Sequence, residues 1–121
     1  MRIKVKVSII NNSGVPVMGP GPLDLLAKVK EHSSISQAAK GMNLSYVKAL
    51  NMLNRLEKSL GHKLFLRRRG GNDRGGTELT PFAEYYLDHY SNLEKRVTEF
   101  ANAEFQSFLK EIESRGEDSR N

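Results

Sequence analysis

Cysteine is absent from this 121-residue chain, and its absence excludes two classes of small domain. Without thiols there is no disulfide framework and no zinc finger held by cysteine ligands. Long apolar runs are also lacking: none approaches the ~20 residues of a membrane-spanning helix, and Lys6 and Asn11 interrupt any signal-peptide core. We therefore expect a soluble, cytoplasmic protein that does not associate with a membrane.

The sequence also has little that catalysis could use. Its three histidines, His32, His62 and His89, are dispersed without the spacing of metal ligands. No paired carboxylates lie in an apolar setting. The glycine-rich stretch at 69–76 lacks the Gly-Lys-Ser/Thr ending of a phosphate-binding enzyme loop. We expect no enzyme, no metal, no cofactor and no small-molecule ligand.

Positive charge is concentrated in the middle of the chain. Residues 40–76 contain nine basic and two acidic side chains, a net charge of +7, whereas residues 77–121 contain five basic and ten acidic ones, a net charge of −5. A polyanion would be attracted to the middle and repelled by the end. A merely solvated charged surface is the alternative, but the positive excess coincides with a helix-turn-helix pattern.

That pattern consists of two short helices joined by a tight turn. Ser36 and Ser45 can each cap a helix with the side-chain hydroxyl, and Gly61 is typical of a helix end. Small residues at 38–39 allow the two helices to approach closely. An apolar stripe of helical spacing follows Ser45 and is expected to face inward; its members are Ala49, Leu53, Leu56 and Leu60.

A basic hairpin is predicted next, with strands at residues 64–68 and 77–79 around a glycine-rich loop. Glycines let a backbone come close to sugar-phosphate, so Arg69 and Arg74 in this loop can reach a minor groove or its phosphates. Thr80 as cap and Pro81 at the first helical position then begin a last helix.

The start of the chain predicts a hairpin and a helix. Ile3, Val5 and Val7 alternate with polar residues as in a half-buried strand, residues 11–14 favour a turn, and residues 15–18 a return strand. A first helix is expected from Pro22 to residue 32. Leu25 lies beside its apolar stripe and is expected to face outward or toward a partner.

The last helix is predicted to be long, over residues 81–115, before a disordered tail at 116–121. Its apolar residues recur at helical spacing farther than a small domain can cover, so a second copy of the same helix is expected to cover them. A stripe that folds back on its own hairpin and first helix, leaving a monomer, is the alternative. The residues expected at the homodimer interface are Leu25, Tyr86, Tyr90, Leu93, Val97, Phe100, Phe105 and Phe108.

In a helix-turn-helix the second helix enters the major groove of double-stranded DNA with its N-terminal residues. Lys48 can donate to guanine, Asn51 can pair with adenine, and Val47 can pack on a thymine methyl group. For Tyr46, a phosphate contact and a core ring with only its hydroxyl exposed remain equal alternatives. The residues expected to bind DNA are Ser34, Ser36, Ser45, Tyr46, Val47, Lys48, Asn51, Arg55, Arg67, Arg69 and Arg74.

Short motifs occur in order through this region: SISQAAK at 34–40, LSY at 44–46 followed by Ala49, RGG at 69–71, GG at 75–76 and LT at 79–80. Together they resemble the DNA-binding domain of molybdate-responsive, ModE-type regulators. LEKSLGHKLF at 56–65, with SIS-x-AA before it, resembles the related LysR-type domain. The doubled glycines and the tyrosine after Ser45 are closer to the ModE pattern.

The resemblance implies a winged helix-turn-helix transcriptional regulator that dimerises through its first and last helices. The sequence stops at Asn121, where metal-sensing members continue, so we expect no molybdate-sensing domain of its own. The expected fold is mainly α (α+β), with an N-terminal β-hairpin at 1–20, a winged helix-turn-helix at 21–80 and the long dimerisation helix. The alternative function is a winged-helix protein-interaction module that does not bind DNA.

Overall fold

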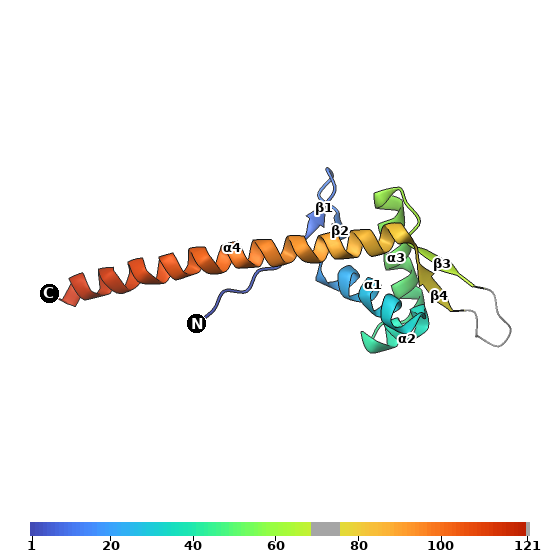
Figure 1. Cartoon of the computed structure of the whole chain (residues 1–121), viewed down its shortest axis with the longest axis horizontal. Helices are drawn as coiled ribbons and strands as arrows, with labels where there is room; N and C mark the ends of the chain where they lie inside the picture. The colour runs from blue at the N-terminus through green and yellow to red at the C-terminus, as the bar shows by residue number, and fades with distance from the viewer. Residues whose placement is uncertain (69–75, 121) are drawn as a thin grey trace.

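The computed structural model describes residues 1–68 and 76–120, with side chains of the last helix described up to residue 116. A group of three helices and two small hairpins packs around one end of a long helix (Figure 1). This is the mainly helical winged helix-turn-helix that the sequence predicts. Its elements are β1 Ile9–Ile10, β2 Pro16–Met18, α1 Pro20–His32, α2 Ile35–Gly41, α3 Tyr46–Leu60, β3 Phe65–Arg67, β4 Thr77–Leu79 and α4 Pro81–Arg120.

The N-terminal hairpin forms, but farther along the chain than expected. Strand β1 pairs antiparallel with β2, and the predicted strand over Ile3, Val5 and Val7 is wrong. The reason lies in the turn: the Asn11 side chain accepts hydrogen bonds from the backbone N–H groups of Ser13 and Val15, at 2.9 and 3.0 Å. This fixes the register, so that residues 9–10 take the pairing positions.

Helix α1 begins two residues before the predicted start. Gly19 occupies the cap position, and its carbonyl accepts from the Leu23 N–H at 3.0 Å. Pro20 and Pro22 both fit the first turn, because the N–H groups of that turn have no partner within a helix. The proline-rich stretch therefore opens the helix rather than separating it from the hairpin.

The caps of the two following helices match the sequence in one case only. Ser45 caps α3 as predicted, accepting from the Lys48 N–H at 3.1 Å. The predicted cap of α2 at Ser36 is wrong, since Ser34 accepts from the Gln37 N–H at 3.1 Å. Ser36 already lies inside α2, whereas Ser34 has the extended backbone that a cap needs. Gly61 ends α3 with a φ of 69°, as expected.

One core joins α1, α2, α3 and the first turns of α4. The predicted inward stripe of α3 is confirmed: Ala49, Leu53 and Leu56 are buried, and Leu60 is half-buried against them. Leu25, Leu26 and Val29 of α1 fill the centre of the same core. Burial of these side chains holds α3 in place with its opposite face toward solvent.

Helix α4 starts as predicted and ends later. The Thr80 hydroxyl accepts from the Ala83 N–H at 3.1 Å and donates to the Lys63 carbonyl at 2.7 Å, which ties the helix start to the hairpin. The helix continues through Gly116 to Arg120, so the predicted helix end at 115 is wrong, as is the predicted disordered tail over its described part, residues 116–120. A single exposed glycine costs a helix about 1 kcal/mol, which the helix-forming residues around it offset. None of the described helices is both long and apolar enough to cross a membrane.

Candidate nucleic-acid interface

The helix-turn-helix is built by a tight connection between α2 and α3. The N–H groups of Met42 and Leu44 both donate to the Ala39 carbonyl, at 3.0 and 2.9 Å, and Asn43 adopts a left-handed φ of 56°. Ala38 and Ala39 are buried, so the two helices approach closely as predicted. The turn leaves the first turn of α3 at the surface.

The predicted recognition residues share that surface. Ser45, Tyr46, Lys48 and Asn51 are all exposed, and Val47 is 65% exposed. An apolar side chain in such a position contributes nothing to the protein's own core, which makes it available to a partner. Arg55 is also exposed, but it lies farther along α3.

The hairpin of β3 and β4 is the wing, and its base is fixed to the helices. The Thr77 N–H donates to the Ser33 carbonyl at 2.8 Å, between α1 and α2. Gly76 lies beside this bond with a φ of 76°, and a Cβ there would lie 3.2 Å from the Ser33 oxygen. The Arg68 N–H donates to the Gly76 carbonyl at 3.0 Å. The wing therefore leaves the domain in a defined direction (Figure 1).

A side-chain contact joins the wing to the recognition helix. Nη2 of Arg67 donates to the Tyr46 hydroxyl, and Cζ of Arg67 lies 5.9 Å from the centre of the Tyr46 ring. Tyr46 is 39% exposed, so of the two alternatives for this residue the core ring is wrong. Nothing in the sequence signals the contact, because 21 residues separate its partners.

The neighbouring arginine has a different partner. Arg68 forms an ion pair with Glu78 across the wing, and both side chains are more than half exposed. Such surface pairs contribute about 0–1 kcal/mol to stability, but the carboxylate reduces the positive potential at Arg68. Arg69 and Arg74, which the sequence predicts to reach DNA, lie outside the described residues.

The two serines predicted at the start of α2 lie in different surroundings. Ser34 is half-buried, and its hydroxyl oxygen accepts from the Gln37 N–H. Ser36 is exposed on the first turn and takes no part in capping. That Ser34 and Ser36 bind DNA stays a prediction.

The predicted dimer residues fall into two groups. Leu25, at 0% exposure, and Tyr90, at 3%, are buried within a single chain, so their assignment to a dimer interface is wrong. Leu25 packs in the core, and the Tyr90 hydroxyl donates to the Val7 carbonyl at 2.6 Å. On α4, exposed or half-buried apolar side chains remain beyond the core; they include Leu93, Val97, Phe100, Phe105, Phe108, Leu109 and Ile112.

Tyr86 lies between the two groups. Its ring is half-buried and stacks near Phe82 and Tyr90, with 6.3 Å between ring centres in each case. Its hydroxyl is buried without a hydrogen-bond partner among the described residues, and this burial raises the pKa of Tyr86.

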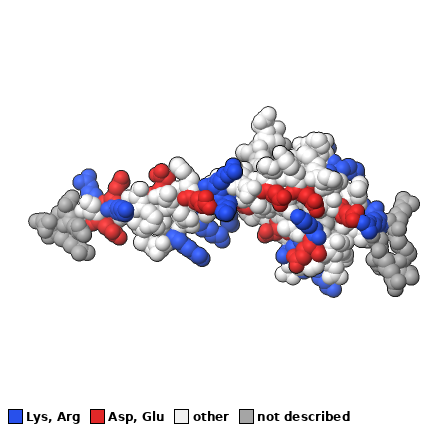
Figure 2. All heavy atoms as spheres, in the orientation of Figure 1, with Lys and Arg blue, Asp and Glu red and all other residues white. Residues whose placement is uncertain are grey.

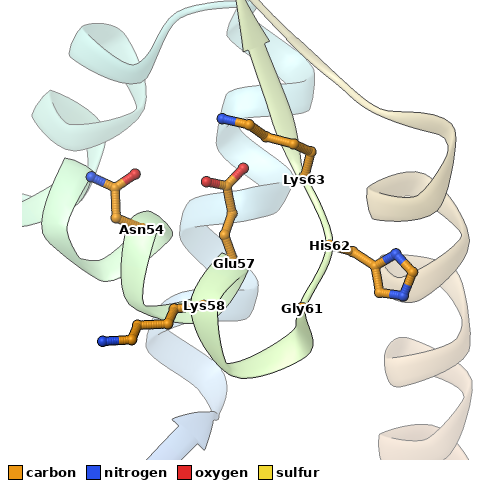
Figure 3. Close-up of a pocket in the computed structure, with 6 residues that line it drawn as sticks. All are labelled: Asn54, Glu57, Lys58, Gly61, His62 and Lys63. Carbon is orange, nitrogen blue, oxygen red and sulfur yellow. The ribbon is translucent and has the colours of Figure 1, made fainter.

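A shallow, open hollow of about 380 Å³ lies at the other end of α3 (Figure 3). Glu57 is bonded to the hairpin, accepting from the Leu64 N–H at 2.8 Å. His62 points toward α4 and stacks on Phe82, with 4.0 Å between ring centres. No three potential metal ligands come together among the residues with described side chains.

Acidic side chains form a band along the first half of α4 in Figure 2, whereas basic side chains lie near the wing end and also around the middle of α4. Over the sequence, residues 40–76 have a net charge of +7 and residues 77–121 a net charge of −5. An anion would approach the wing and the recognition helix rather than the side of α4 seen here.

This geometry agrees with a family assignment. The model of bacterial regulatory helix-turn-helix proteins of the lysR family matches residues 22–84, which is more than half of the chain. The chain belongs to this family. The resemblance to LysR-type domains is thereby confirmed, and the matched region runs from α1 to the first turn of α4.

Two relatives and one solved structure extend the comparison. The transcriptional regulator ModE of Haemophilus influenzae is 38% identical over 76 residues, 63% of this chain and 30% of that protein. The molybdenum transport protein ModE of Azotobacter vinelandii is 31% identical over 101 residues, 74% of this chain and 37% of that protein. The BenM_DBD/benA site 1 DNA complex superposes with a TM-score of 0.54 at 22% identity, over 78% of this chain and 99% of that one.

The chain spans about a third of the length of the two ModE relatives. The solved structure shares the fold at low identity, and it covers almost the whole of its own chain. The N-terminal hairpin of β1 and β2 lies outside the region that the family model matches.

Proposed function

We propose that this protein is a sequence-specific, DNA-binding transcriptional regulator that acts in the cytoplasm as a homodimer. The observation that carries the proposal is the joint exposure of the first turn of α3 and the arginine-bearing strand β3, which are held together by the Tyr46–Arg67 contact. The ModE relative is named as a transcriptional regulator, and the BenM domain was solved on DNA. Both support the proposal.

The exposed side chains divide into two kinds of contact. Val47, Lys48 and Asn51 lie on the first two turns of α3, where a helix in the major groove meets base edges. Lys48 has a point charge for guanine acceptors and Asn51 has a donor and an acceptor for adenine. Ser45 and Arg67 flank them and suit phosphates, which position a protein without reading sequence.

The proposal of a homodimer is based on the part of α4 that lies beyond the core. Phe100 is 68% exposed, and Phe108 and Ile112 are more than half exposed, on a helix that leaves the core behind. A second copy of this helix would cover such a stripe, as two-fold symmetric interfaces do. Two recognition helices related in this way would read half-sites ~34 Å apart, or a multiple of that distance.

Binding to duplex DNA as a function of salt tests the proposal. Fragments of the source genome are first selected for binding, and affinity is then followed by fluorescence anisotropy between 50 and 300 mM salt. For a DNA reader, log affinity falls linearly with log salt, with a slope of about 0.9 for each neutralised phosphate. No binding, or a flat response, would instead support a winged-helix module that binds protein.

A further inference from the structure

We propose that Tyr46 and Arg67 together form the binding site for a single phosphate of the DNA backbone, shared between α3 and β3. This inference rests on the proposed function, and it adds which groups of the interface act as one unit. It also assigns the contact between recognition helix and wing a role in binding rather than in folding.

The direction of the hydrogen bond supports a shared anion site. Because Nη2 of Arg67 donates to the Tyr46 oxygen, the hydroxyl hydrogen of Tyr46 remains to be donated elsewhere. The guanidinium carries five N–H donors in a planar fork, and this contact uses one of them. The pair therefore offers hydrogen-bond donors from two side chains around one positive charge. Two oxygens of a phosphate can accept such charge-assisted hydrogen bonds.

The surroundings leave that charge available. Arg68, the next residue, is paired with Glu78, whereas the residue opposite Arg67 in the wing is Thr77, which is buried and uncharged. No carboxylate contacts Arg67 among the residues described at 1–68 and 76–116. The Tyr46 ring, 5.9 Å from Cζ, restricts the guanidinium and lowers the entropy lost when a ligand binds.

A phosphate fits better than a base edge. Tyr46 lies at the first position of α3, and Arg67 ends strand β3, so the pair spans the gap between the two elements. Where a helix occupies the major groove and a wing lies beside it, the DNA between them is backbone. A contact to a base would instead make the effect of Tyr46 depend on sequence, which the experiment below distinguishes.

The first experiment is a double-mutant cycle on a selected duplex, with wild type, Y46F, R67Q and the double variant. Y46F keeps the ring and removes only the hydroxyl, and about a tenfold loss of affinity is expected; R67Q should cost about thirtyfold, as for hydrogen bonds to a charged group. The double variant should lose no more than about fiftyfold, because both side chains bind the same phosphate and each orients the other. A loss of about three hundredfold, the product of the two, would overturn the proposal.

The second experiment finds the phosphate. Each phosphate of the duplex is replaced in turn by an uncharged methylphosphonate, and affinities of the four proteins are compared. At one position, the methylphosphonate should weaken binding by wild type and abolish the differences in affinity among wild type, Y46F and R67Q. If the two variants respond at different positions, or Y46F responds to base changes instead, the shared site is wrong.

R68Q is the matched control, since Arg68 is adjacent and its partner is Glu78. In an R68Q background, Y46F should still cost about tenfold; loss of that effect would indicate general disorder of the wing and overturn the proposal. All variants should melt within a few degrees of wild type, because the substituted side chains are exposed and exposed substitutions change stability little. Absence of wild-type binding to any duplex would reject the proposed function itself, which is a different outcome from independent effects.

Discussion

The wing end and the far end of α4 are both exposed, but they expose opposite chemistry. At the wing end, α3 presents Tyr46, Lys48 and Asn51 beside Arg67, and its apolar residues other than Val47 are mostly buried or half-buried. Along the far part of α4, the exposed residues include Phe100, Phe108 and Ile112. Polar donors and positive charge suit an anion, whereas large exposed apolar side chains suit another protein surface. Under the proposed function, one small chain would thus bind its two partners at opposite ends.

The largest effect is expected when charged residues are introduced into the apolar stripe on the far part of α4. The double substitution F100E/F108E should convert the proposed dimer to a monomer, because four carboxylates would have to be buried in the interface. Losing the second half-site should reduce affinity for a two-half-site duplex by about a hundredfold or more, since linked sites gain that much. Analytical ultracentrifugation and anisotropy measure the two effects.

E104Q/E111Q is the control for a change of charge on the same helix. Both glutamates are exposed, and neither substitution changes the apolar stripe. This variant should stay dimeric. A wild-type protein that sediments as a monomer at micromolar concentration would show that the aromatic stripe has another partner.

The wing end is tested next by Lys48→Ala. Lys48 is exposed on the first turn of α3, and its backbone N–H rather than its side chain makes the cap bond to Ser45. Loss of one base contact should weaken the preferred duplex by about tenfold or more, and random DNA by less. Anisotropy on both duplexes measures the ratio. Equal losses on the two would reassign Lys48 from base reading to phosphate binding.

The next prediction concerns the serines that cap α2 and α3 and their contribution to stability. S34A should destabilise the domain by about 1 kcal/mol, because the Gln37 N–H loses its acceptor, whereas S36A should change stability by a few tenths at most. S45A should resemble S34A, since Lys48 N–H has the same kind of bond. Urea unfolding measures all three. Equal effects of S34A and S36A would contradict the cap assignment.

These caps illustrate how far the sequence alone predicts the fold. Periodicity located α3 and its buried stripe, because burial of one helix face leaves a strong pattern. The sequence predicted Ser36 as the cap of α2, but the cap is Ser34, because the backbone is extended there and already helical at Ser36. Likewise the alternation over Ile3, Val5 and Val7 predicts a strand that pairs with residues 15–18, but the Asn11 turn assigns that pairing to residues 9–10.

The candidate site was predictable in its parts but not in its connections. Exposed residues at the start of α3 follow from the helix-turn-helix pattern, and the arginines of β3 from their charge. The Tyr46–Arg67 contact and the Arg68–Glu78 pair are tertiary, and which arginine each partner takes depends on the wing register, Arg67 opposite Thr77. Leu25 was misplaced for the same reason: a stripe on α1 does not reveal that helices pack on both of its sides.

The smallest effect is expected where the two regions of α4 meet, at Tyr86. Its hydroxyl is buried without a described partner, so Y86F should leave stability unchanged or raise it by up to about 1 kcal/mol at pH 7.

Burial raises the pKa of Tyr86, so the folded state favours the neutral phenol. Stability from this source is complete below the ordinary pKa of 10.0 and is lost as pH rises above it. Y86F should therefore unfold less readily than wild type between pH 10 and 11, in melting curves followed by circular dichroism. The pKa of Tyr90 is also raised by burial, so part of the alkaline loss should remain in Y86F and a smaller part in Y86F/Y90F. If Y86F instead destabilised the protein by more than 1 kcal/mol at pH 7, the hydroxyl would have a partner, and the junction of α4 with the core would be more polar than the contacts described here.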